Sequence, residues 1–133
     1  MKLTLFYCDK ALNRSDGKLD IEGVFNELYA PGFPARQDHI VLAGTIEWDR
    51  TDDGTQPFQI EIDDPEGKTI FTISGRTDVD ARPQRRPPAR TCLVLPIEKL
   101  TFPEPGDYQS RVRIKDMLLP GPSLHLMETE SGG

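Results

Sequence analysis

Apolar and polar residues alternate with a period of two along most of this chain, and no stretch shows the 3.6-residue period of an amphipathic helix. The clearest alternation is in residues 58–63, Phe-Gln-Ile-Glu-Ile-Asp. Successive side chains of a strand point to opposite faces, so such a segment buries one face and exposes the other. The 11 glycines and 12 prolines divide the chain into short elements. These features predict an all-β protein, a sandwich or small barrel of about seven or eight strands.

Three local signals divide the expected strands. Residues 64–67, Asp-Pro-Glu-Gly, have proline and glycine at the positions that a type I turn favours, which predicts a hairpin between 58–63 and 68–73. Gly23 interrupts the strand that begins at Leu19, which indicates a bulge or a close backbone approach. Residues 31–34, Pro-Gly-Phe-Pro, cannot lie inside a central strand, so they are expected to cross from one sheet to the other.

Residues at inward positions of the clearest strands form the expected core. Tyr108 follows Pro105 and Gly106 near the start of the penultimate expected strand. In immunoglobulin-like sandwiches a tyrosine at this place hydrogen-bonds back to the preceding corner, so the sequence favours an immunoglobulin-like antiparallel sandwich. The eight residues expected to be buried are Ile46, Trp48, Phe58, Ile60, Leu93, Leu95, Tyr108 and Val112.

The length of 133 residues fits one domain, expected over residues 1–128, with a flexible tail at 129–133. The first ten residues contain no apolar run of signal-peptide length, and no window approaches a membrane span. A cytoplasmic location with both Cys8 and Cys92 reduced is therefore expected. A disulfide between these cysteines stays possible if their strands are neighbours.

Catalytic signals are weak. The chain has two histidines, His39 and His125, and neither accompanies a Gly-x-Ser-x-Gly elbow or a nearby cysteine nucleophile. Both cysteines lie in apolar strands, whereas a reactive thiol needs exposure near a cation. We therefore expect neither an enzyme nor a bound cofactor.

One acidic turn resembles part of a calcium loop. Asp49, Thr51 and Asp53 occupy positions 1, 3 and 5, and Gly54 occupies position 6. Position 12, which requires a bidentate glutamate, is Ile60, and the flanking segments are expected strands. A solvated turn is the better interpretation. A weak site completed by Asp63, Asp64 or Asp78 from other loops remains the alternative.

Charge is distributed unevenly along the chain, whose formal net charge is -6. Residues 47–66 hold eight acidic residues against Arg50 alone, whereas residues 76–90 hold five arginines against two aspartates. The simplest interpretation is a set of solvated faces that keep strand edges from pairing with other chains. A second interpretation is a polar surface that steers a protein partner or a second copy of this chain. The candidate partner-binding residues are Arg82, Arg85, Arg86, Arg90, Arg111 and Arg113.

Two other roles of the arginine-rich segment have less support in the sequence. Nucleic-acid binding is disfavoured by the acidic balance and by the lack of aromatic residues among the arginines to stack bases. Residues 85–90, Arg-Arg-Pro-Pro-Ala-Arg, lack the Pro-x-x-Pro spacing of a polyproline ligand. A stiff connection between the sheets, with its arginines exposed, is the favoured structural interpretation.

Three segments together resemble a known family. They are residues 17–25, Gly-Lys-Leu-Asp-Ile-Glu-Gly-Val-Phe; residues 29–35, Tyr-Ala-Pro-Gly-Phe-Pro-Ala; and residues 102–108, Phe-Pro-Glu-Pro-Gly-Asp-Tyr. The chain is similar, over about residues 2–128, to a bacterial family of small proteins catalogued only as a domain of unknown function. The resemblance implies a compact immunoglobulin-like fold and assigns no catalytic residue. The arginine-proline run at 82–90 lies outside the family's pattern.

These observations predict a non-enzymatic protein-interaction module in the bacterial cytoplasm. Its partner would be an unknown protein or a second copy of the chain, with no nucleic acid and no membrane involved. The alternative function is a small-ligand or ion-binding sandwich that uses the loops at one end.

Overall fold

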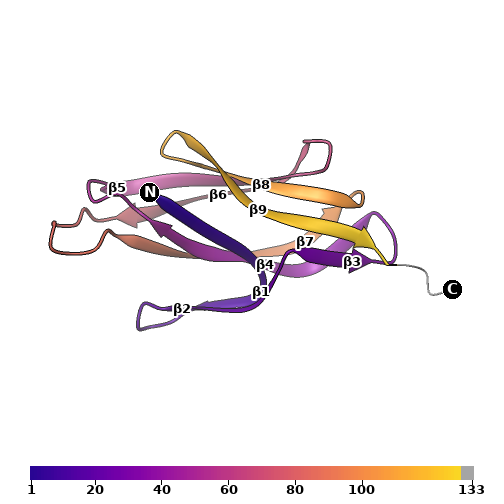
Figure 1. Cartoon of the computed structure of the whole chain (residues 1–133), viewed down its shortest axis with the longest axis horizontal. Coiled ribbons are helices and arrows are strands. Elements are labelled where there is room, and N and C mark those ends of the chain that lie inside the picture. The colour runs from indigo at the N-terminus through magenta and orange to yellow at the C-terminus, as the bar shows by residue number, and fades with distance from the viewer. Residues whose placement is uncertain (130–133) are drawn as a thin grey trace.

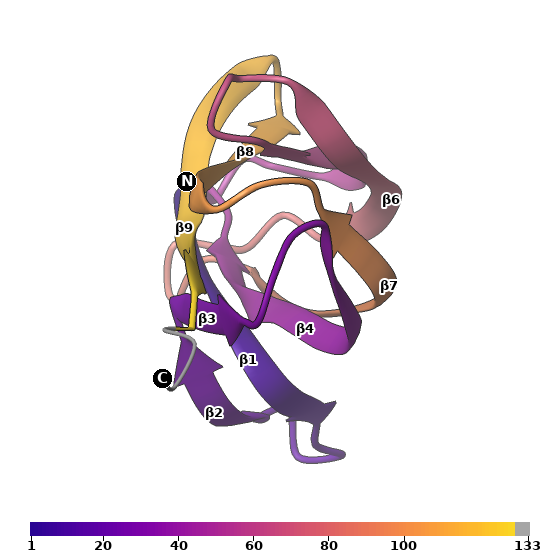
Figure 2. The same cartoon turned by 90° about the vertical axis from the view of Figure 1, so that its right-hand side faces the viewer.

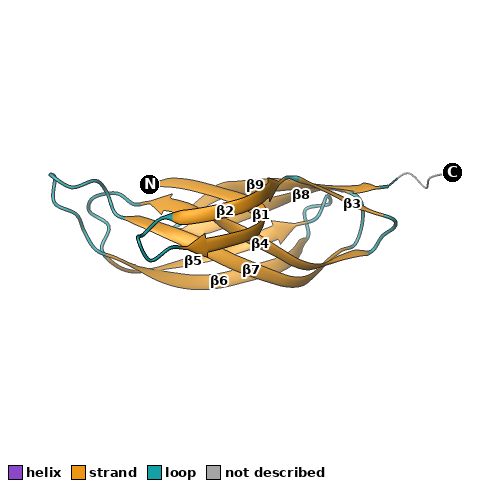
Figure 3. Cartoon of the chain, turned by 90° about the horizontal axis from the view of Figure 1, so that it is seen from below, coloured by secondary structure: helices purple, strands orange, loops and turns teal. Residues whose placement is uncertain are grey.

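The computed structural model describes residues 1–129, and within them nine strands form two sheets (Figure 1). One sheet has four strands in the order β2-β1-β4-β7, and the other has five in the order β3-β9-β8-β5-β6. Figure 3 shows that strands and loops alone make up the described chain. The strands are β1 (Lys2–Asn13), β2 (Leu19–Phe25), β3 (Glu27–Ala30), β4 (Ala35–Glu47), β5 (Gly54–Asp63), β6 (Thr69–Val79), β7 (Arg90–Phe102), β8 (Gly106–Ile114) and β9 (Met117–Glu128).

The predicted all-β class is confirmed, but the expected strand number was too low because β3 was missed. β3 has four residues and lies directly before the Pro31–Pro34 crossing, so it is too short to show alternation. It pairs in parallel with β9, and the backbone N–H of Thr129 donates to Ala30 O at 2.8 Å. The rest of the predicted tail, residues 130–133, lies outside the described residues.

The hydrophobic core lies between the two sheets, which Figure 2 shows end-on with β8 and β6 above and β4, β1 and β2 below. Seven of the eight residues predicted to be buried are at most 7% exposed, and Leu95 is half-buried against the same core. The Trp48 indole N–H donates to Thr91 Oγ1 at 2.8 Å, so this large ring is buried without losing its hydrogen bond. The predicted strand registers are therefore confirmed for the core.

Two tyrosine hydroxyls satisfy buried polar positions. The Tyr108 hydroxyl donates to Glu104 O at 2.7 Å and accepts the Glu104 N–H at 3.2 Å. This is the bond back to the preceding corner that the sequence predicted. The Tyr7 hydroxyl of β1 contacts Ser110 Oγ of β8 at 2.5 Å, which joins the two sheets through a buried hydrogen bond.

The β1–β2 hairpin covers part of the outer face of the four-stranded sheet. The hairpin turns back beneath the sheet (Figure 1). Its tip comes close to the start of β7, where Arg90 Nη2 lies 3.5 Å from Gly17 O. Gly23 has a φ of 68° beside Asp9, and a Cβ at this position would overlap the Asp9 carboxylate. The register of β1 and β2 is unshifted across Gly23 and the neighbouring atoms belong to the Asp9 side chain, so the predicted bulge or close backbone approach is not what this glycine accommodates.

A small apolar cluster fills the space under the hairpin. Cys8, Val41 and Ala43 are buried there, and Ala11 and Ile21 of the hairpin pack against them. Cys8 lies opposite Val41 on one side of β4, whereas Cys92 lies opposite Thr45 on the other. Because β4 separates their strands, the condition for the alternative disulfide is not met, and both thiols are free. Residues 1–129 contain no helix with the length and apolarity of a membrane span.

Candidate functional site

The six arginines predicted to bind a partner lie in two separate places. Arg82, Arg85 and Arg86 belong to the β6–β7 loop, and Arg90 begins β7. Arg111 and Arg113 lie on β8, on the outer face of the five-stranded sheet. Arg85, Arg86 and Arg90 are exposed, as expected. The expectation is wrong for Arg82, which is half-buried because its backbone is held against the turn after β4. The six arginines therefore do not form one continuous surface.

The β6–β7 loop is held by the turn that follows β4. The Trp48 N–H donates to Ala89 O at 2.8 Å, and the Arg82 N–H donates to Arg50 O at 3.2 Å. The Arg50 guanidinium donates from Nη1 to Pro83 O at 3.1 Å and also to Arg86 O. These contacts favour the interpretation of the loop as a stiff connection. Arg50 was not predicted to have this role, although it is the lone cation of the acidic stretch.

Arg111 and Arg113 are bound within the chain. Arg111 Nη2 lies 3.0 Å from Glu61 Oε2, and Arg111 Nε forms a 2.6 Å ion pair with Asp63 Oδ2. Arg113 Nε lies 3.0 Å from Glu61 Oε1. A hydrogen bond to Asp63 is the main cause that raises the pKa of Arg111. The acidic stretch and the basic stripe, far apart in sequence, therefore neutralise each other on adjacent strands.

The carboxylates of the acidic turn are also bound. Lys115 Nζ lies 2.9 Å from Asp49 Oδ2 and 2.8 Å from Asp52 Oδ1, and the Met1 amino group lies 2.7 Å from Asp49 Oδ1. Hydrogen bonds from these two cations lower the pKa of Asp49 to about 2. Within residues 1–129 no group of three potential metal ligands is assembled.

We expect calcium to leave the melting temperature nearly unchanged. A calcium ion would have to displace the Lys115 ammonium from Asp49 and Asp52, and the loop lacks its closing glutamate. Differential scanning fluorimetry with millimolar CaCl₂, against MgCl₂ at equal ionic strength, measures this directly. A large increase specific to calcium would contradict the expectation, because a ligand that binds only the native state raises stability.

Both histidines are paired with carboxylates on neighbouring strands. His39 Nδ1 lies 2.7 Å from Glu98 Oε1, and His125 Nδ1 lies 2.6 Å from Asp107 Oδ1. All four side chains are exposed at the surface or its rim. Cys8 is buried in the apolar cluster, and burial raises the pKa of its thiol, which keeps it in the less nucleophilic form.

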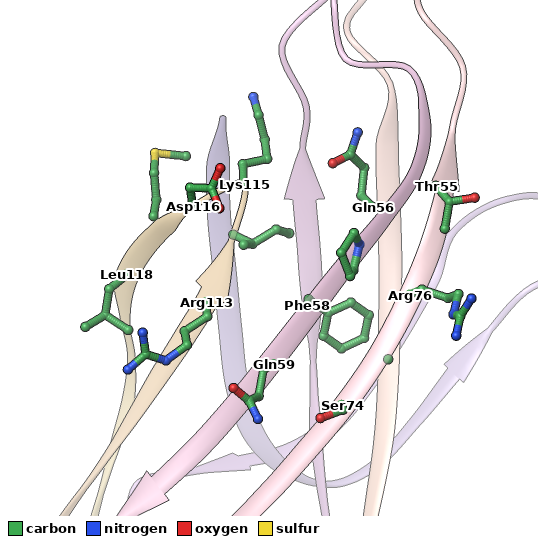
Figure 4. A pocket seen from close by; sticks show the side chains of 14 residues that line it. Thr55, Gln56, Phe58, Gln59, Ser74, Arg76, Arg113, Lys115, Asp116 and Leu118 are labelled. Atoms are coloured by element: carbon green, nitrogen blue, oxygen red, sulfur yellow. The ribbon is translucent and has the colours of Figure 1, made fainter.

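A groove of about 1160 Å³ lies on the outer face of the five-stranded sheet, and sequence analysis did not predict it. Figure 4 shows Gln59 between Ser74 and Arg76 of β6 and Arg113 of β8, with Leu118 of β9 beyond. The β8–β9 hairpin forms one wall. Its turn residues have positive φ values, 52° at Lys115 and 60° at Asp116, which are typical of a tight two-residue hairpin turn.

The groove combines cationic, polar and apolar groups. Its charged lining residues are Arg76, Arg113, Lys115 and Asp116. Arg113 is paired with Glu61 and Lys115 with Asp49 and Asp52, so the uncompensated positive charge of the groove is that of Arg76. Among the residues that the structure describes, Arg76 has no carboxylate within ion-pair distance. Leu118 is 50% exposed and its neighbour Met117 is 41% exposed. The sequence feature that could have indicated this apolar wall is the pair of large apolar residues, Met117 and Leu118, directly after the turn residues Lys115 and Asp116.

The groove and nearly all of both sheets lie within a region that matches a family model. Residues 3–126 match the family of unknown function DUF6941. The chain belongs to this family. The predicted family resemblance is thereby confirmed, and all residues that line the groove fall inside the matched DUF6941 region. No curated protein matches the chain.

Proposed function

We propose that this DUF6941 chain is a non-enzymatic protein-interaction domain whose groove binds an extended segment of a partner protein. The segment would carry an acidic side chain and a large apolar side chain. The observation that supports this most directly is the pairing of free positive charge with exposed apolar surface in one concavity.

The charge of the groove argues for an acidic partner. Most charged side chains elsewhere on this face of the sheet are already paired, as Arg111 is with Glu61 and Asp63. Arg76 is exposed and has no such partner among the described residues, and Arg113 contacts Glu61 through Nε. An acidic side chain would gain a charge-assisted hydrogen bond there without breaking an existing ion pair.

The apolar wall argues for a protein rather than a free anion. Leu118 is 50% exposed and lies opposite Arg113 on the groove face of the sheet, and Met117, at the end of the groove beside the hairpin turn, is 41% exposed. Apolar surface gathered beside a polar floor is the arrangement typical of interaction sites, where a few buried side chains supply most of the affinity. A small anion would engage the arginines and leave this wall uncovered.

The strand order supports an immunoglobulin-like assignment of the fold. With β1, β4 and β7 as strands A, B and E, the second sheet supplies C, C′, F and G as β5, β6, β8 and β9. Tyr108 then lies near the start of strand F, where the tyrosine corner belongs. The parallel pairing of β3 with β9 places an A′ strand beside G.

The remaining elements of the proposal concern chemistry and location. The histidine–carboxylate pairs join neighbouring strands, and the thiol of Cys8 is buried, which supports a non-enzymatic role. Two free cysteines are compatible with a reducing compartment, so we propose the bacterial cytoplasm. The small-ligand alternative has less support, because the groove is open and the acidic turn is occupied by Lys115.

Partner capture tests the proposal through one side chain of the groove. We expect Leu118→Asp to reduce capture of the partner from a host lysate at least tenfold, because it places a carboxylate on the apolar wall. Leu12→Asp is the matched control, since Leu12 is similarly exposed, at 57%, but lies on the β1–β2 hairpin. Quantitative mass spectrometry of the captured proteins gives the ratio. Equal loss with both variants, or no loss with Leu118→Asp, would contradict a role for the groove.

A further inference from the structure

The four edge strands of the two sheets differ in how they resist pairing with another chain. Unpaired edges invite strand addition, and proteins prevent it with short strands, prolines, charges and bulges. β3 has only four residues, and β2 carries Asp20, Glu22 and the left-handed Gly23. β7 contains Pro96 and the left-handed Lys99. Three of the edges thus carry protective features.

β6 differs from them, because its two charged residues, Arg76 and Asp78, have opposite signs and can attract a second copy, whereas the like charges of Asp20 and Glu22 on β2 repel one. It is the edge of the five-stranded sheet and runs for 11 residues without a proline or a lysine. The one irregularity in its pairing with β5 lies at its beginning, opposite Ile62 and Asp63. From Phe71 to Val79 it pairs regularly with β5, so its other side presents a regular row of backbone groups.

The side chains of β6 are complementary to a second copy of the same strand. Arg76 and Asp78 are two residues apart and lie on the same face, opposite Pro57 and Thr55 of β5. An antiparallel copy related by a two-fold axis at Thr77 would place Arg76 opposite Asp78 of the copy, and Asp78 opposite its Arg76. Such a pairing uses residues 75–79 of each strand, a typical strand length.

The two neighbouring registers are less complementary, because each opposes two like charges at its centre. Residues that lie opposite each other must point to the same face of the sheet. An odd-numbered residue of one β6 strand must therefore lie opposite an odd-numbered residue of the other, which limits the allowed registers. Moving the axis by one residue toward Arg76 places the two Arg76 side chains opposite each other, and moving it to Asp78 opposes the two aspartates. Like charges directly opposite destabilise a strand pair. We propose that β6 is a self-association edge, at which two copies pair antiparallel about Thr77 and extend the five-stranded sheets into one.

Charge reversal at the two positions tests this register. We expect Arg76→Asp and Asp78→Arg, each alone, to weaken dimerisation about tenfold or more, because two attractive pairs become repulsive. The double variant Arg76→Asp with Asp78→Arg should dimerise like the unmodified chain. A mixture of the two single variants should form a heterodimer, since one copy then carries two acidic residues and the other two basic ones.

Sedimentation velocity over a concentration series measures the effect, with circular dichroism to verify the fold of each variant. Arg85→Asp is the control, because it makes the same charge change at an exposed position of the β6–β7 loop. A monomeric unmodified chain, or dimers that are indifferent to the single reversals, would overturn the inference. It goes beyond the proposed function but uses the same Arg76, so Asp78 of the second copy would compete for this side chain with an acidic residue of the partner. Leu118-dependent capture by a monomer would leave the proposed function intact.

Discussion

Gly44→Ala is expected to lower the free energy of unfolding by about 3 kcal/mol or more, or to prevent folding. Gly44 lies on the core face of β4, opposite Leu5 of β1. A Cβ there would overlap the Thr4 carbonyl oxygen and lie 2.8 Å from Leu5 Cα. These are backbone atoms inside a paired sheet, so no rotation of a side chain relieves the overlap.

Urea denaturation of the variant measures the effect, and Gly32→Ala is its matched control. Gly32 lies in the β3–β4 crossing with nothing within 4 Å of an added Cβ, so its replacement should change stability by less than about 1 kcal/mol. If Gly44→Ala were as well tolerated as Gly32→Ala, the register between β1 and β4 would be wrong.

Tyr7→Phe is expected to cost about 1–3 kcal/mol at neutral pH, because it leaves the buried Ser110 hydroxyl without its partner. Adding Ser110→Ala should recover part of this loss, since both polar groups are then removed. Tyr29→Phe is the control, because Tyr29 is 57% exposed and its hydroxyl lies at 3.4 Å from Glu27. Thermal denaturation of the four proteins provides the comparison.

The same tyrosine gives stability a pH dependence in alkali. Burial raises the pKa of Tyr7 to about 12 from its ordinary value of 10.0. Between pH 10 and 12 the unfolded chain loses this proton and the folded chain keeps it, so stability falls as pH rises. The decline should be shallower for Tyr7→Phe, and not absent, because burial also raises the pKa of Tyr108. Identical alkaline profiles for the two proteins would contradict a buried Tyr7.

The core and the tyrosine corner could be predicted from the sequence because each depends on local pattern. Alternation fixes which side of a strand is buried, and it placed Ile60 and Val112 correctly. The short order Pro-Gly-x-Tyr likewise placed Tyr108, whose hydroxyl bonds only four residues back. The β3 strand escaped prediction because its partner, β9, is almost a hundred residues away.

The candidate site could not be predicted for a similar reason. Arg111 and Arg113 read as a free basic stripe until strand pairing placed Glu61 beside them. The groove arises from four strands, β5, β6, β8 and β9, whose order along the sheet is not visible in the chain. The same holds for the outer face of the four-stranded sheet. No pattern within residues 9–25 predicts that the β1–β2 hairpin folds back over Val41.

Hydrogen exchange of the domain with and without its captured partner tests the central claim most directly. We expect the partner to slow exchange of the backbone amides in residues 55–59 and 113–118, which line the groove. Residues 82–90, which hold four of the arginines first singled out by their charge, should exchange at unchanged rates. Protection confined to residues 82–90, with none at the groove, would contradict this account.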